Sequence, residues 1–187
     1  MFNLHSEENC SLPDFPIETY GAVAGRIRGQ EVVCGGSLTD QCFNILSGED
    51  TSIRLVKSRR YASSVTTDDK LFIFGGYAAL DSYEVISEED HIQKSMPFEW
   101  SFACSVLIND TTILLIGGPP PGHSESWYFH FEADEWIQGP KMNQERYKHG
   151  CGFFKALKSV AVFGGVPYTD TAEILPIDER QFSYSKN

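Results

Sequence analysis

Four glycine pairs, each directly after an apolar run, are the feature that most constrains how this chain can fold. The first glycines are Gly35, Gly75, Gly117 and Gly164, so successive pairs are 40, 42 and 47 residues apart. A period in this range is typical of repeat proteins, in which each unit is a small sheet that cannot bury its faces alone. Glycine at a strand end also reaches positive φ and lets another backbone or a large side chain come close. The spacing therefore predicts four equivalent units in one array.

The same order of strand and turn signals recurs around each pair. A short strand and a polar turn come first, as at 62–65 and 66–70, and the apolar run into the glycines follows. Such runs are expected for strands that are covered on both faces. A third strand, as at 83–86, and a weaker fourth strand after an acidic turn complete the unit. Four short antiparallel strands in about 43 residues match the composition of a propeller blade. We predict a lead segment at 1–19 and a propeller at 20–187, with units at roughly 20–58, 59–98, 99–145 and 146–187.

These motifs resemble the kelch-repeat family of β-propellers over most of the chain, from about Tyr20 onward. The matching features are the apolar-Gly-Gly strand ends, a tryptophan 18 residues past Gly118, and an aromatic residue partway to the next strand: Trp136, and Phe43, Tyr83 and Tyr128. The resemblance implies an all-β, kelch-type propeller of about four blades of four antiparallel strands. Kelch rings usually have more blades, so it also implies a fragment, an open ring, or a ring completed by another copy. An open ring leaves sheet edges and apolar faces uncovered, which favours self-association.

Strand order divides the loops between two rims. The turns between strands one and two and between strands three and four share one rim, and acidic turns such as 88–90 and 132–135 gather there. The opposite rim carries the loops between units and the loops between strands two and three, which kelch proteins commonly use to bind partner peptides. Arginine and tyrosine on rigid exposed loops are typical of interface hot spots. The hypothetical partner-binding residues on this rim are Arg59, Arg60, Tyr61, Tyr77, Trp100, His123, Arg146, Tyr147, His149 and Tyr168.

The charge of the chain narrows the class of partner. The formal net charge is −11 at pH 7, and a surface of that sign repels nucleic-acid phosphates and anionic lipid. We therefore expect a protein or peptide partner with acidic character on the basic rim, and neither nucleic acid nor membrane. In the competing interpretation, the arginines between units simply pack against the neighbouring blade. No apolar run reaches the length of a membrane helix.

The cysteines leave the cellular compartment open. Cys34 ends one strand and Cys42 begins its hairpin partner, so the two could face each other at a distance that a disulfide accepts. Cys10 is an alternative partner for either. Cys104 and Cys151 occupy equivalent first-strand positions, where we expect buried thiols of the core. A secreted protein is permitted by a Cys34–Cys42 hairpin and by the sequons at Asn9 and Asn109, whereas the absence of a signal peptide after Met1 favours the cytoplasm.

Enzyme motifs are absent from the sequence. It contains no Gly-x-Ser-x-Gly, no phosphate-cradling loop before a helix and no His-Glu-x-x-His, and its histidines have no ligand-like spacing. We expect a non-enzymatic interaction module without metal or cofactor. The alternative is a sugar-binding or sugar-acting propeller, with the architecture of galactose oxidases or mutarotases. Aromatic residues near a central pocket favour that alternative: Tyr77, Trp100, Tyr147 and Tyr168.

Overall fold

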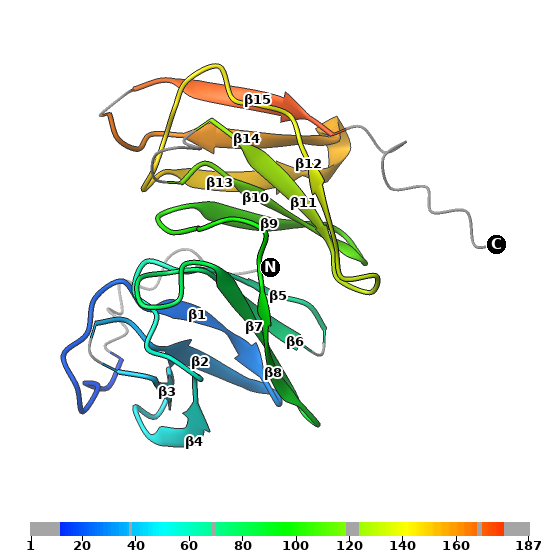
Figure 1. Ribbon diagram of the computed structural model, residues 1–187. Helices are drawn as coiled ribbons and strands as arrows, with labels where there is room; N and C mark the ends of the chain where they lie inside the picture. Colours follow the sequence, from blue (N-terminus) through cyan, green and yellow to red (C-terminus); the bar gives the residue numbers. More distant parts are fainter. Residues whose placement is uncertain (1–11, 38, 69, 119–123, 168–169, 178–187) are drawn as a thin grey trace.

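The computed structural model describes residues 12–177, except 38, 69, 119–123 and 168–169. The fold is all-β and consists of four antiparallel sheets that follow one another along the chain (Figure 1). The first sheet is β1 (Val23–Ile27), β2 (Gln30–Cys34), β3 (Gln41–Asn44) and β4 (Asp50–Arg54). The second is β5 (Ser63–Thr66), β6 (Lys70–Phe74), β7 (Ser82–Ser87) and β8 (His91–Ser95). The third is β9 (Cys104–Asn109), β10 (Thr112–Ile116), β11 (Ser126–His130) and β12 (Glu135–Gln138).

The fourth sheet contains three strands within the described residues. These are β13 (Gly150–Phe154), β14 (Ser159–Phe163) and β15 (Ala172–Pro176), with a short 3-10 turn, η1 (Lys155–Leu157), between the first two. Strands are paired in chain order in every sheet, and the second strand always ends directly before the first glycine of a pair. The predicted order of strands is therefore confirmed for the first three units and for the three described strands of the last. The expected fourth strand of the last unit falls at 178–187, outside the described residues.

The sheets stack on one another through their first strands. β1 lies beside β5, β5 beside β9, and β9 beside β13. Side-chain hydrogen bonds join these strands: the Ser64 hydroxyl donates to the Ala24 carbonyl at 2.9 Å, and the Ser105 hydroxyl donates to the Ser64 carbonyl at 3.3 Å. The first and last sheets lie at opposite ends of the molecule (Figure 1). The arrangement is propeller-like, with first strands on a common side.

The core consists of three apolar layers, one between each pair of successive sheets. Alternate residues of a strand point to opposite faces, so the second strands of the two middle sheets, β6 and β10, each contribute to two layers. Val32 and Cys34 of β2 pack with Leu71 and Ile73 of β6, and all four are almost fully buried. The next layers repeat this pattern with β6 against β10 and β10 against β14. The nearly continuous apolar runs of the sequence follow from this two-sided burial.

The glycine pairs occupy the places where the loop of the next sheet approaches. A Cβ atom added to Gly75 would lie 1.9 Å from the Trp100 carbonyl oxygen, and its φ is +61°. At Gly117 an added Cβ would lie 2.6 Å from the Arg146 carbonyl oxygen. No side chain fits between these backbones, so close approach and positive φ both require glycine here.

Two disulfides tie the sheets. Cys34 and Cys42 face each other across β2 and β3 and are bonded, as the hairpin predicts. The expectation of free core thiols at Cys104 and Cys151 was wrong, because these residues form a second disulfide between β9 and β13. Each lies 13 residues before the first glycine of its pair, and neighbouring first strands lie side by side. Equivalent positions therefore come within the Cα separation of 6.0 Å that the bond spans.

Candidate functional site

The loops that enter the four sheets are joined by a repeated backbone contact. Each loop has one residue at positive φ, which is Gly21, Tyr61, Phe102 or Lys148. The N–H of each of the last three donates to the carbonyl of its counterpart in the preceding loop, at 2.7 Å for Tyr61 and 2.8 Å for Phe102 and Lys148. The Gly21, Tyr61 and Phe102 carbonyls are the acceptors. We call this series the loop ladder, and it holds the four loops on one rim.

Aromatic side chains cover this rim. Tyr61 and Phe102 stack with ring centroids 4.3 Å apart, and Tyr20, Tyr77 and Tyr147 lie around them at 5.6 to 6.2 Å. We call these five residues the aromatic rim. Tyr20 and Tyr77 are 53% and 40% exposed, so much of their surface can contact another molecule.

Two cations stand over the aromatic rim. The Arg60 guanidinium lies 4.9 Å from the centre of the Tyr77 ring, and the exposed Lys148 ammonium lies 4.8 Å from that of Phe102. Arg60 and Tyr77 also form an isolated β-bridge between the entry loop and the two-to-three loop of the second sheet. Stacking on rings holds both charges in place without neutralising them. The rim therefore combines fixed positive charge with amphipathic aromatic surface.

A pocket of about 380 Å³ opens beside Arg60, between the loops of the first two sheets. Its lining is small and polar apart from the cation–π pair: Gly36, Ser37, Ser58, Arg60, Tyr77 and Ala78. Arg60 donates to the Tyr20 hydroxyl at 3.0 Å. Hydrogen bonds from Ser37 and Arg60, together with the Arg60 charge, lower the pKa of the Tyr20 phenol. The phenol oxygen is thus held as an acceptor at the edge of the pocket.

Arg59 was expected on the accessible rim, but the structure buries it completely. It donates to Glu84 at 2.6 Å and to the Gly75 and Ser82 carbonyls, each at 2.8 Å. Burial alone would raise the pKa of Glu84, but hydrogen bonds from His91, the Val56 N–H and Arg59, with the Arg59 charge, hold it below the usual value. Arg59 therefore binds the loop to the second sheet, and no partner can reach it.

Arg146 repeats this arrangement in the last sheet and is also fully buried. It donates to Glu173 and Thr171 and, at 2.9 Å, to the Gly164 carbonyl. Trp100 occupies the same position in the third sheet's entry loop as Arg59 and Arg146 in theirs. It is 3% exposed and lies inside the second apolar layer. His149 is 9% exposed, and burial, with the Arg146 charge, lowers its pKa to about 4. These four residues are therefore buried, and the side chains of the two arginines bind the sheet that follows them in the chain and not the neighbouring blade.

The structure therefore divides the ten expected residues into three groups. Arg60, Tyr61, Tyr77 and Tyr147 meet at the aromatic rim, either directly or through Phe102. Arg59, Trp100, Arg146 and His149 are buried, and His123 and Tyr168 lie outside the described residues.

Sequence reasoning missed Tyr20 and Phe102, whereas Lys148 was expected on this rim but not among the binding residues. Phe102 could have been found, because it is the second residue after Trp100, as Tyr61 is after Arg59 and Lys148 after Arg146.

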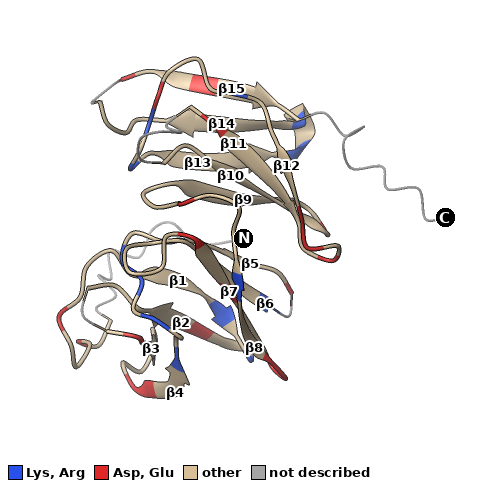
Figure 2. Cartoon of the chain, in the orientation of Figure 1, with Lys and Arg blue, Asp and Glu red and all other residues tan. Residues whose placement is uncertain are grey.

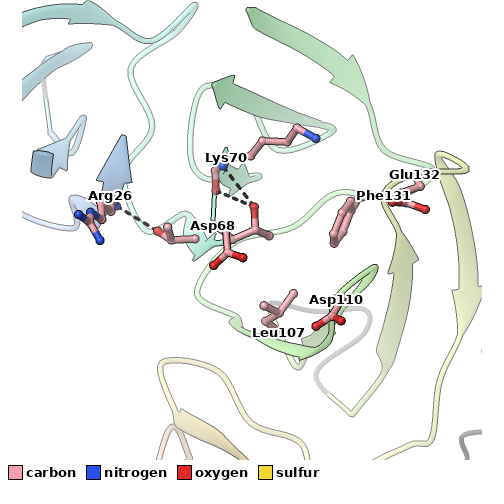
Figure 3. Close-up of a pocket in the computed structure, with 9 residues that line it drawn as sticks. Arg26, Asp68, Lys70, Leu107, Asp110, Phe131 and Glu132 are labelled. Carbon is pink, nitrogen blue, oxygen red and sulfur yellow. Dashed lines mark hydrogen bonds between the residues drawn. The ribbon is translucent and has the colours of Figure 1, made fainter. Parts of the chain in front are cut away.

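The opposite rim gathers negative charge. Figure 2 shows Asp and Glu at the turns that join β7 to β8 and β11 to β12. A pocket of about 500 Å³ lies on this side, where Asp68, Asp110 and Glu132 come from three different turns, with Arg26 and Lys70 beside them (Figure 3). In the part of the chain that the structure describes, no three His, Cys, Asp or Glu side chains are arranged to hold a metal ion. Acidic turns thus gather on this rim, as the sequence predicts.

Comparison with known proteins does not assign the chain to a family. No protein-family model matches the sequence, and no curated protein matches it either. Among the described residues, no helix is both long enough and apolar enough to cross a membrane.

Proposed function

We propose that this chain is a kelch-type propeller array that acts as a protein-interaction module. The aromatic rim is the binding surface, and an acidic peptide or acidic protein surface is the ligand. The observation that carries the proposal is the pair of cations fixed over exposed aromatic rings, Arg60 on Tyr77 and Lys148 on Phe102. Tyrosine and arginine are enriched in interface hot spots, and a tyrosine ring brings large contact area at little entropic cost.

Charge contrast within the molecule supports this ligand class. The whole chain carries a net charge of −11, yet Arg60 and Lys148 stand together on the aromatic rim. A ligand with a carboxylate would be attracted to these two cations, whereas the net negative charge of the chain disfavours its non-specific association. The polar pocket beside Arg60 can admit a single carboxylate side chain, with the Ser37 and Ser58 side chains on its wall.

The test is an array of acidic and neutral peptides probed with the purified protein, followed by affinity measurement on the best acidic binder. We expect Arg60→Glu and Lys148→Glu each to weaken binding at least tenfold, because each replaces attraction by repulsion. Arg28→Glu is the matched control, since Arg28 is an exposed arginine in the β1–β2 turn on the opposite rim. Equal affinity of the Arg60→Glu, Lys148→Glu and wild-type proteins would overturn the proposal.

A sugar-binding propeller is the second candidate, and the exposed rings of Tyr20 and Tyr77 favour it. Two of its four expected aromatic residues no longer support it, because Trp100 is buried and Tyr168 lies outside the described residues. A glycan array separates the two candidates. Glycan binding that is lost in Tyr77→Ala, without any acidic peptide binder, would favour the sugar.

The two disulfides support an oxidising compartment for this module. Disulfides persist in secreted proteins and are reduced in the cytosol. We therefore propose the secreted alternative over the cytoplasmic one.

A further inference from the structure

The last sheet has an apolar face that the described chain leaves uncovered. Phe163 and Ile174 are 53% and 63% exposed, and Phe154 on the same face is 51% exposed. The counterparts of Phe163, which directly precede the first glycine in the other sheets, are buried: Cys34, Phe74 and Ile116 are at most 1% exposed. In those sheets the next sheet covers the face. We call the contact between two successive sheets a junction, and the fourth sheet thus presents one half of a junction without its partner.

The glycine at this junction is uncovered as well. A Cβ atom on Gly35, Gly75 or Gly117 would meet the loop of the following sheet within about 3 Å, whereas at Gly164 it would meet nothing within 4 Å. The second glycine of each earlier pair donates its N–H to a carbonyl of that loop. These bonds are Gly36 to Arg59 at 2.9 Å, Gly76 to Trp100 at 2.8 Å and Gly118 to Arg146 at 3.2 Å. Within the described residues, the Gly165 N–H has no such acceptor.

The first sheet presents the other half of the junction. Thr19 stands where Arg59, Trp100 and Arg146 stand in later loops, and its carbonyl has no donor among the described residues. Four residues before it, Phe15 holds the position of Leu55, Met96 and Met142, and its ring packs 6.0 Å from that of Phe43. The loop ladder also begins here, with a Gly21 N–H that lacks a preceding carbonyl in the described chain.

We propose that two copies of this chain close head to tail into one ring of eight sheets. The last sheet of each copy packs against the first sheet of the other, and the Thr19 carbonyl accepts from the Gly165 N–H. The Gly21 N–H donates to the Lys148 carbonyl, which continues the loop ladder. Propellers of eight blades are within the range that the architecture allows, and a two-fold ring is closed. The array presents its two half-junctions at opposite ends (Figure 1), where a second copy can engage both.

Back-to-back pairing of two last sheets would cover the same apolar face but would not use the backbone groups. It would leave the Thr19 carbonyl and the Gly21 N–H without partners, because both belong to the first sheet's loop. Head-to-tail closure repeats the three junctions that the chain already contains. Head-to-tail closure by a second copy is therefore favoured over back-to-back pairing.

Glu31 gives the proposal a sharp test. Its counterparts in the other sheets are Leu71, Ile113 and Val160, which are fully buried in the junctions. Glu31 is exposed and pairs with Arg26 at 3.7 Å. In a head-to-tail ring it faces the apolar last sheet of the second copy, which weakens the association. Leucine at this position should strengthen it.

The experiment measures the mass of the intact chain by sedimentation equilibrium over a concentration series. We expect a dimer that dissociates on dilution. Phe163→Asp should weaken it about 100-fold or more, because a carboxylate then faces an apolar surface, while Glu31→Leu should tighten it about tenfold. Ile92→Asp is the matched control. Ile92 is 42% exposed on β8 of the second sheet, which belongs to neither half-junction, so the dimer of this variant should be as stable as that of wild type.

Three outcomes would overturn the head-to-tail ring. The first is a monomer for wild type and Glu31→Leu up to about 100 µM. The second is a dimer that Phe163→Asp does not weaken. The third is a dimer that Phe163→Asp weakens but Glu31→Leu leaves unchanged, which identifies back-to-back pairing. Circular dichroism of each variant shows that the fold is kept, and Phe163 is half exposed, so its replacement spares the core.

Discussion

At the residue scale, Gly75 shows how tightly the junctions are built. We expect Gly75→Ala to destabilise the protein by on the order of 3 kcal/mol or more, because a Cβ there lies 1.9 Å from the Trp100 carbonyl oxygen and one backbone has to move. Chemical denaturation measures the effect. Gly29→Ala is the control: Gly29 also has positive φ, at +74°, but an added Cβ meets nothing within 4 Å, so only the strain of about 1 kcal/mol remains. Equal losses would contradict the argument from close approach.

The same scale shows what the sequence could and could not predict about the site. Arg59 and Arg60 are adjacent and chemically identical, yet one is buried against Glu84 and the other stands over Tyr77. The sequence places both in one loop, but the direction of each side chain depends on contacts with residues 17 to 25 positions away. Phe102 has positive φ and completes the aromatic rim, and its only sequence signal is its place two residues after Trp100.

At the element scale, strand order follows from local patterns, whereas contacts between sheets do not. The apolar runs before Gly75 and Gly117 identify β6 and β10 because two-sided burial demands an unbroken apolar strand. The Cys34–Cys42 hairpin follows from the same local register. The Cys104–Cys151 bond does not, because it depends on β9 and β13 lying side by side. Equal offsets from the glycine pairs were its only sequence signal.

That bond should also contribute more stability than the hairpin bond. Cys104 and Cys151 are 47 residues apart, against 8 for Cys34 and Cys42. A longer closed loop removes more entropy from the unfolded chain. Replacing Cys104 and Cys151 with serine should therefore lower the free energy of unfolding by about 4 kcal/mol, and replacing Cys34 and Cys42 by about 2.5 kcal/mol. Urea denaturation of the two double variants measures this difference. Counting reactive thiols in denatured wild type is the control, and five free thiols would show that neither bond had formed.

At the scale of the whole molecule, the stability should fall in two stages as the pH is lowered. Burial, with the Arg146 charge, lowers the pKa of His149 to about 4, whereas an unfolded histidine titrates near 6.5. Between these pH values His149 is protonated in the unfolded chain but not in the folded chain. The free energy of unfolding is therefore highest above pH 6.5 and declines as the pH falls toward 4. The loss from His149 is at most about 3 kcal/mol.

The carboxylates act at lower pH and so define the second stage. Burial alone would raise the pKa values of Glu84, Asp134 and Glu173, but hydrogen bonds and nearby cations hold all three below their usual values. Their stabilisation is present above the ordinary carboxylate pKa and is lost as the pH falls below it. His149→Phe should therefore flatten the decline between pH 6.5 and 4 while leaving the acid transition in place, and urea denaturation across this range measures both. A decline of unchanged slope in His149→Phe would show that another group governs this window, such as His130, whose pKa is also lowered by burial.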